Sequence, residues 1–188
     1  MSPSPARTSE AAIVEAGRDL LEEHGLDAVT MAAVAARVGV KAPSLYKHVR
    51  DRGALVGLIV ADTARELTRV LNAAAPSSHS DPERALRAIA TAYRRFARSR
   101  PRASSLLFAD LGPDLVVPLD DLAAAAQPLV EVTGALVGVD RALPAARALT
   151  AFVHGFTSME TAGVFRLGRG VDDAYATGID ALIRGLQD

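Results

Sequence analysis

The side chains best suited to chemistry lie between Thr30 and Arg52, where cations and hydroxyls gather in a short stretch. Residues 37–52 hold five Lys or Arg against a single acid, whereas the whole chain of 188 residues has 21 Lys and Arg against 22 Asp and Glu. Ser44 and Tyr46 add hydroxyl groups in the same window. For a polyanionic partner, the position of the charge matters more than the net charge of −1. The segment therefore predicts binding to nucleic acid.

Two short helices separated by a tight turn are expected to position these side chains. Apolar residues recur at helical spacing over residues 31–38, and Thr30 can cap that helix. Residues 39–41 (GVK) form the expected turn, and Pro43 suits the first turn of a further helix that runs to about Val49. This is a helix-turn-helix arrangement, whose second helix can enter the major groove of DNA.

Arg52 stands at the expected start of a longer helix, with Asp51 as its cap. A cation at a helix N-terminus is poorly placed for the helix dipole, and a nearby phosphate would compensate for it. We take this mismatch as the best single sign that the face meets DNA. The alternative interpretation is three packed helices with a solvated basic rim.

The stretch from about Ala6 to Asp62 resembles the DNA-binding domain of the TetR family of bacterial transcriptional regulators. The residues that carry the resemblance form an ordered signature: Gly25-Leu26, Thr30, Val34-Ala35, Val38-Gly39-Val40, Ser44-Leu45-Tyr46-Lys47-His48-Val49, Arg52 and Leu55. The resemblance implies phosphate-contacting positions for Thr30, Ser44 and Arg52. It implies groove-facing positions on the recognition helix for Ala42, Pro43, Tyr46, Lys47 and His48.

Three departures from the family pattern bear on this prediction. Lys41 stands where the family often has a capping Ser, so the third helix loses a cap and gains a charge beside phosphate. Val49 replaces a frequent Phe, and Ala32 has no side chain for base reading. Direct readout is therefore expected to be sparse, with more weight on the DNA backbone and on DNA shape.

Apolar spacing of three and four recurs along the rest of the chain, and aromatic residues make up only 4%. We therefore expect an all-α protein of about nine helices. Residues 1–52 would form a helix-turn-helix domain, with the motif at about 29–48, and residues 53–188 a helical ligand-binding and dimerisation domain. Leu149 to Phe165 also resembles one TetR subgroup, in which an aromatic or apolar residue precedes His-Gly in the penultimate helix.

The family resemblance implies a small-molecule effector inside the C-terminal helices. The sequence supplies a lining that is mostly apolar with a few polar groups: Tyr93, Phe96, Leu107, Phe108, Phe152, His154, Phe156 and Met159. Plain core packing is the alternative interpretation for each of them. Gly155 indicates close approach of another helix or of the ligand.

Five arginines follow one another closely near residue 100. A solvated helix end explains them better than a second anion site, because cations are stabilised at a helix C-terminus. They are Arg94, Arg95, Arg98, Arg100 and Arg102.

The partners expected from this interpretation are a palindromic double-stranded DNA operator, a second copy of the chain and the effector. The last two helices, about 143–166 and 171–187, would pair with their copies in a four-helix bundle. The two heads would then lie about 34–36 Å apart. The activity expected on this basis is repression relieved by a small apolar or amphipathic effector.

The chain lacks the motifs of the other classes that we considered. It has no cysteine, no catalytic motif and four scattered histidines, so we expect no enzyme, no metal site and no cofactor. Its longest stretch without Asp, Glu, Lys or Arg, from Ala148 to Met159, is 12 residues, too short for a membrane span. With no secretory signal visible, the expected location is the cytoplasm. A helical small-molecule-binding protein or enzyme without DNA binding, and a protein–protein adaptor, remain the alternatives.

Overall fold

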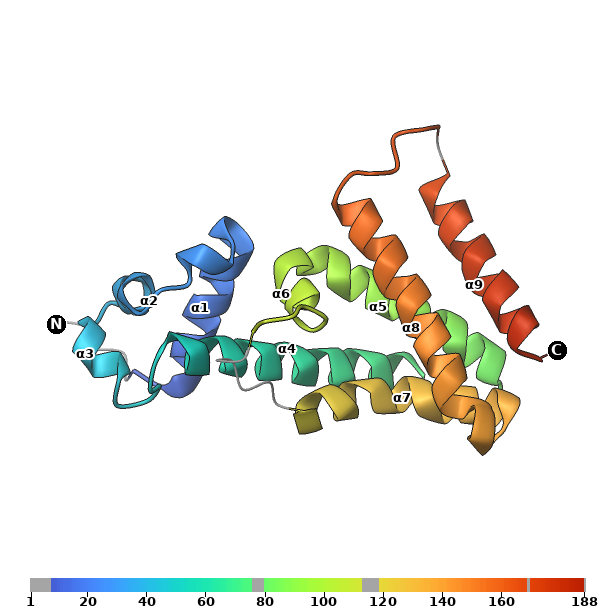
Figure 1. Cartoon of the computed structure of the whole chain (residues 1–188), viewed down its shortest axis with the longest axis horizontal. Helices are drawn as coiled ribbons and strands as arrows, with labels where there is room; N and C mark the ends of the chain where they lie inside the picture. The colour runs from blue at the N-terminus through green and yellow to red at the C-terminus, as the bar shows by residue number, and fades with distance from the viewer. Residues whose placement is uncertain (1–7, 76–79, 113–118, 169, 188) are drawn as a thin grey trace, which may run out of the picture. The chain divides into compact units, whose positions relative to one another are not determined.

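The computed structural model describes residues 8–75, 80–112, 119–168 and 170–187. Over these ranges the chain forms nine α-helices, one 3-10 helix and no strand, which confirms the predicted fold class (Figure 1). In chain order the elements are α1 (Glu10–His24), η1 (Leu26–Ala28), α2 (Met31–Val38), α3 (Ala42–Leu45), α4 (Arg52–Ala74), α5 (Pro82–Ser99), α6 (Pro101–Leu106), α7 (Leu119–Val137), α8 (Val139–Thr161) and α9 (Val171–Gln187).

The helices belong to two compact units. The first comprises residues 1–63 and 102–118, and the second comprises residues 64–101 and 119–188. The predicted domain boundary after residue 52 coincides with the start of α4, whereas the compact units part further along this helix. No pattern in the sequence indicated that α6 belongs with the N-terminal helices.

Local capping and one close helix crossing define the first unit. Ser9 caps α1 by accepting a hydrogen bond from the Ala12 N–H at 3.2 Å. Gly17 lies against α4, so close that a Cβ atom on it would be 2.9 Å from Cδ1 of Ile59. This contact lets α1 pack tightly on the first half of α4.

Reciprocal bonds join α1 to α6 within the same unit. The Glu22 carboxylate accepts hydrogen bonds from the backbone N–H groups of Arg102 at 3.2 Å and Ala103 at 2.8 Å. The Arg102 guanidinium donates in return to the Glu22 carbonyl at 2.5 Å. Each helix end thus receives the partner that its unpaired backbone groups require.

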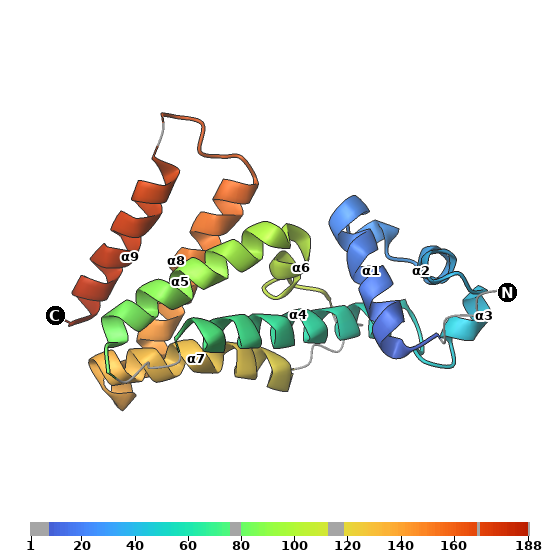
Figure 2. The ribbon, with the colours of Figure 1, turned by 180° about the vertical axis from the view of Figure 1, so that it is seen from behind.

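The second unit is a bundle of α5, α7, α8 and α9 together with the last part of α4. Contacts join α7 to α8, α5 to both of them, and α9 to α5 and α8 (Figure 2). The Asp81 side chain caps α5 by accepting from the Arg84 N–H at 3.0 Å, and Pro82 lies in the first turn. Leu86, Ile89 and Ile183 are among the buried side chains of this core.

Three helix boundaries differ from the sequence prediction. The helix expected at about 143–166 is α8, which starts earlier because Gly138, at φ 85°, allows the chain to turn before Val139, and which ends at Thr161. Regular helix α3 ends at Leu45 rather than at Val49.

Over the part of the chain that the structure describes, no helix has the length and apolar character needed to cross a bilayer.

Candidate functional site

The turn between α2 and α3 matches the expected helix-turn-helix. Thr30 caps α2 by accepting from the Ala33 N–H at 3.1 Å. The helix ends at Gly39, whose φ of 81° is left-handed, and the Val40 N–H closes the turn on the Ala35 carbonyl at 2.9 Å. The predicted cap and the predicted turn at residues 39–41 are both confirmed.

Two buried residues fix the orientation of α3 and the turn that follows it. Leu45 is 0% exposed and Val49 is 2% exposed, and the Val49 N–H donates to the Leu45 carbonyl at 2.9 Å. Tyr46, which lies between them, is 55% exposed. Lys47 is also exposed, and so is Pro43 one helical turn earlier. We call Pro43 on α3, and Tyr46 and Lys47 in the turn that follows it, the recognition face, because all three side chains are exposed.

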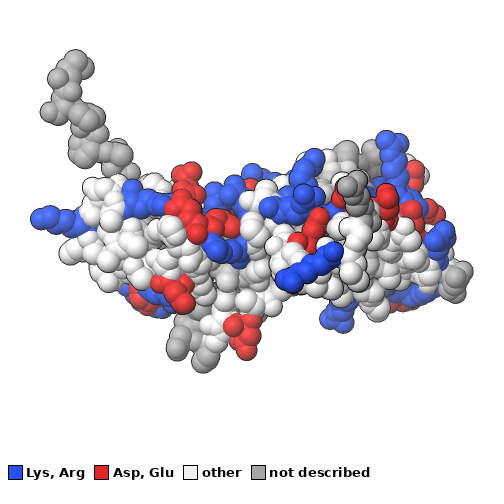
Figure 3. Space-filling model, turned by 90° about the horizontal axis from the view of Figure 1, so that it is seen from above, with Lys and Arg blue, Asp and Glu red and all other residues white. Residues whose placement is uncertain are grey.

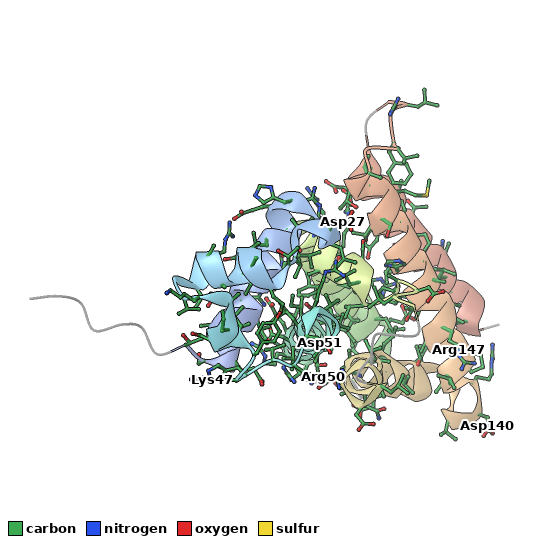
Figure 4. All side chains as sticks on the ribbon, turned by 60° about the vertical axis from the view of Figure 1, so that its left-hand side comes forward. Asp27, Lys47, Arg50, Asp51, Asp140 and Arg147 are labelled. Atoms are coloured by element: carbon green, nitrogen blue, oxygen red, sulfur yellow. The ribbon has the colours of Figure 1, made fainter. Side chains whose placement is uncertain are left out.

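Most of the cations in this segment have partners within the chain. The Arg37 guanidinium hydrogen-bonds the Glu23 carboxylate, and this bond lowers the pKa of Glu23. Arg50 pairs with Asp51 at 2.7 Å, which Figure 4 shows at the start of α4. By contrast, Lys41 and Lys47 form no ion pair over the described ranges, and Figure 4 shows Lys47 at the outer edge of the α3 segment.

Arg52 has a different role from the one that its position in the sequence suggests. Its Nε donates to the Val29 carbonyl at 2.7 Å and its Nη2 donates to the Leu26 carbonyl at 2.8 Å. The expectation of an uncompensated cation is therefore wrong, because two backbone acceptors already satisfy the guanidinium. Arg52 holds the segment that leads into Thr30, and its contact with phosphate stays a prediction.

The remaining predicted DNA contacts lie in the same segment. The Thr30 hydroxyl oxygen is used as the α2 cap, which leaves its proton able to reach a phosphate. Ser44 and Ala42 are half-buried, and the Ser44 N–H donates to the Lys41 carbonyl at 2.8 Å. His48 is exposed beside Lys47. The structure thus gathers these residues around α3 and the start of α2.

The predicted effector residues divide between the two units. Leu107 and Phe108 belong to the first unit. In the second unit Tyr93 is buried on α5 and its hydroxyl lies 3.0 Å from His154 Nδ1 on α8. Burial raises the pKa of Tyr93 and lowers the pKa of His154, so both stay neutral around pH 7. This pair joins α5 to α8 through two uncharged side chains.

The other predicted effector residues of the second unit belong to different environments. Phe96 is 4% exposed and is part of the core, whereas Met159 is 45% exposed. Phe152 and Phe156 are half-buried, with ring centroids 5.7 Å apart.

An ion-pair cluster that the sequence did not reveal lies beside these rings. The Arg94 side chain is 11% exposed and donates to both carboxylate oxygens of Glu160 at 2.8 and 2.7 Å. It also pairs with Asp172 at 2.8 Å and lies 4.6 Å from the centroid of the Tyr175 ring. The interpretation of Arg94 as part of a solvated helix end is therefore wrong. Because 66 residues separate Arg94 from Glu160, no local pattern could have paired them.

Small residues occupy outer positions of α8 and α9. A Cβ atom added to Gly155 or to Gly185 would meet nothing within 4 Å. Gly178 differs, because a Cβ atom there would lie 2.2 Å from the Phe152 ring. We call the following residues the small-residue faces of the two helices: Ala148, Ala151 and Gly155 on α8, and Ala174, Thr177, Ala181 and Gly185 on α9.

Comparisons with known proteins cover both units. A family described as "Bacterial regulatory proteins, tetR family" matches residues 13–58, and one described as "Tetracyclin repressor-like, C-terminal domain" matches residues 86–182. An uncharacterized HTH-type transcriptional regulator of Mycobacterium tuberculosis, Rv0681, is 31% identical over 163 residues, which are 85% of this chain and 73% of that protein. An uncharacterized HTH-type transcriptional regulator of Bacillus subtilis, YobS, is 26% identical over 99% of this chain and 96% of that protein.

Solved structures share the fold. A protein with unknown function from Rhodococcus sp. RHA1 has a TM-score of 0.86 at 22% identity and covers 100% of both chains. A TetR variant from Acinetobacter baumannii AYE, in complex with minocycline, has a TM-score of 0.72 at 23% identity and covers 96% of this chain and 97% of that one. At these identities the similarity concerns the fold alone.

Proposed function

Because this chain belongs to the TetR family of bacterial regulatory proteins and is a DNA-binding transcriptional regulator, we propose that it is a repressor. In this proposal a homodimer binds a palindromic operator, and a small apolar or amphipathic effector releases it. The observation that carries the proposal is the recognition face. It exposes an aromatic ring and a lysine without an ion pair over the described residues, held outward by buried Leu45 and Val49.

A dimer is required because one short helix reads too few base pairs to be selective. Two copies of α3 spaced by about 34–36 Å would meet successive major grooves on one side of the duplex. The small-residue faces of α8 and α9 support an interface there, since residues without bulky side chains let two helices approach closely. The proposed dimer is a four-helix bundle of α8 and α9 from both copies.

The effector would bind in the second unit, near Tyr93 and His154. These side chains offer a hydroxyl and an imidazole, and α8, the helix that carries His154, also carries the half-buried rings of Phe152 and Phe156. That chemistry suits an aromatic or amphipathic molecule with one or two polar groups. The effector would need to favour one spacing of the heads, and a coupling of about 1–3 kcal/mol is typical of such control.

The proposal assigns the protein no catalytic role and places it in the cytoplasm, where the operator DNA of a bacterium lies. Charge is distributed in a way that suits a small DNA-binding patch rather than a strongly basic protein. Figure 3 shows Lys and Arg interspersed with Asp and Glu over the face that it presents. Binding should therefore depend on the few cations around α3.

The proposal is tested by binding of the full chain to a palindromic fragment from the DNA beside its own gene, over a series of salt concentrations. We expect Tyr46→Ala and Lys47→Ala each to weaken binding about 5- to 150-fold, the loss expected for one good contact. Arg95→Ala is the matched control, because it removes an exposed cation from α5, outside both the recognition face and the proposed dimer interface. Binding that is unaffected by Tyr46→Ala, by Lys47→Ala and by the DNA sequence would refute the proposal.

A further inference from the structure

The recognition face has a composition that limits the bases it can read. Between Gly39 and Arg50 the chain contains no Asn, Gln, Asp or Glu. The strong bidentate contact to adenine uses Asn or Gln, and the contact to the cytosine amino group uses Asp or Glu. Neither contact is available from α3 or from the turns on either side of it.

The recognition face then offers one cation, Lys47, and an apolar surface. Lys47 is exposed and makes no ion pair within the described ranges, whereas the neighbouring Arg50 is held by Asp51 at 2.7 Å. Pro43 is exposed on the same side, and Tyr46 is 55% exposed, a large fraction for an aromatic side chain. A lysine suits the O6 and N7 acceptors of guanine, and apolar groups suit the C5 methyl of thymine.

From this chemistry, which rests on the proposed function, we infer that Lys47 reads a guanine and that Pro43 and Tyr46 pack on a thymine methyl. The operator half-site therefore contains guanine and thymine at the positions that face α3. The hydroxyls of Ser44 and Tyr46 and the ring of His48 supply single hydrogen bonds only. Single bonds discriminate less between bases than a pair of bonds to one base does.

Lys41 differs from Lys47 in a way that gives an internal control. It is the residue before α3, with extended φ −80° and ψ 144°, and its side chain is exposed outside the recognition face. Lys47 belongs to the recognition face itself, in the turn that follows α3. We assign Lys41 to the DNA backbone and Lys47 to a base edge.

The experiment selects binding sites for the full chain from a library of duplexes with a randomised core. Dissociation constants are then measured on the enriched duplex and on copies with each guanine replaced by 7-deazaguanine or each thymine by uracil. We expect one guanine per half-site at which Lys47→Ala loses about 5- to 150-fold of the discrimination against other bases. Lys41→Ala should instead weaken binding to all duplexes alike and reduce the slope of log Kd against log salt by about 1.

The thymine contact has its own pair of variants. Tyr46→Phe keeps the ring and should remain sensitive to the replacement of one thymine by uracil, whereas Tyr46→Ala should bind both duplexes equally. Thermal unfolding of every variant shows that the fold is intact. An enriched site at which Lys47→Ala acts like Lys41→Ala would overturn the inference and leave the proposed function standing. A library that yields no two-fold symmetric site would overturn both.

Discussion

Tyr46 in the first unit and Tyr93 in the second both lie on or beside a helix, yet Tyr46 is 55% exposed and Tyr93 is 5% exposed. Tyr93 places its hydroxyl 3.0 Å from His154. The cations show the same contrast. Lys47 has no ion pair over the described residues, while Arg94 binds two carboxylates. On the recognition face the groups that could bind a partner are kept available, whereas Tyr93 and Arg94 of the second unit bind other side chains of the bundle.

This difference explains why the ligand of the first unit is easier to infer from its side chains than the ligand of the second unit. A side chain without a partner inside the protein is available for an external ligand, so the residues of the recognition face indicate the kind of ligand that they bind. A side chain that already has a partner, such as Arg94 or Tyr93, stabilises the bundle whether or not an effector binds. The predictions below test whether the contrast holds when single side chains are removed.

The largest effect is expected from Leu45→Ala, since Leu45 is 0% exposed and orients the recognition face. Loss of a buried leucine costs about 2–5 kcal/mol of unfolding free energy. We expect this loss together with loss of sequence-specific DNA binding, measured by urea unfolding and by titration with operator DNA.

Ile183→Ala is the matched control in the second unit, because Ile183 on α9 is also 0% exposed. It should cost a similar free energy of unfolding. Amide hydrogen exchange should locate the Leu45→Ala effect in α2 and α3 and the Ile183→Ala effect in α5, α8 and α9. Uniform loss of protection in both variants would show that the two units unfold as one.

Arg94→Ala should be the next largest change. The side chains of Arg94 and Glu160 are 11% and 16% exposed, so the loss should lie between the small cost of an exposed pair and the about 3–5 kcal/mol of a fully buried one. Arg95→Ala, on the exposed side of the same helix, should change the free energy of unfolding little. Urea unfolding of both variants at neutral pH checks the difference.

The same pair predicts a dependence of stability on pH. The hydrogen bond from Arg94 lowers the pKa of Glu160. Folding then favours the ionised carboxylate, so its contribution is complete above the pKa of the unfolded chain and is lost as the pH falls through the lowered pKa of the folded state. Acidification should destabilise the parent protein more than Arg94→Ala. An identical acid dependence in both proteins would exclude the pair as its cause.

Two glycines of the bundle provide a smaller and more selective test. A Cβ atom on Gly178 would lie 2.2 Å from the Phe152 ring, so Gly178→Ala should cost about 1–3 kcal/mol through overpacking. A Cβ atom on Gly155 meets nothing within 4 Å, so Gly155→Ala should stabilise an isolated chain by about 0.5–1 kcal/mol.

Sedimentation distinguishes the two glycines further. If α8 packs on a second copy as proposed, Gly155→Ala should raise the dissociation constant of the dimer even though it stabilises the helix. A Gly155→Ala protein that associates as tightly as the parent would place the interface elsewhere.

Features specified by neighbouring residues could be predicted from the sequence. The predicted caps at Thr30 and Asp51 are confirmed, because a capping side chain bonds an N–H only a few residues away. The turn at residues 39–41 is confirmed for the same reason, since Gly39 permits the left-handed conformation. These local signals sufficed to place the recognition face.

Features that depend on distant partners could not be predicted. Arg52 looked like an unsatisfied cation because its acceptors, the carbonyls of Leu26 and Val29, lie on a 3-10 turn that the sequence did not indicate. The sequence also did not indicate that Leu107 and Phe108, which follow α6, belong to the first unit. Contacts of this kind are decided by the packing of whole helices, which no short pattern encodes.

The smallest effect is expected from removing one helix N-cap in each unit. Thr30 and Asp81 are both N-caps, accepting backbone hydrogen bonds at 3.1 and 3.0 Å. Either alanine variant should lose about 1 kcal/mol of unfolding free energy. Only Thr30→Ala should also weaken DNA binding, by about 2- to 10-fold and alike for every duplex, because only Thr30 is predicted to donate a hydrogen bond to a phosphate. Titrations of both variants with the operator and with an unrelated duplex decide the point. Equal affinities would mean that Thr30 serves the fold alone, and that the phosphates beside α2 are held by backbone N–H groups.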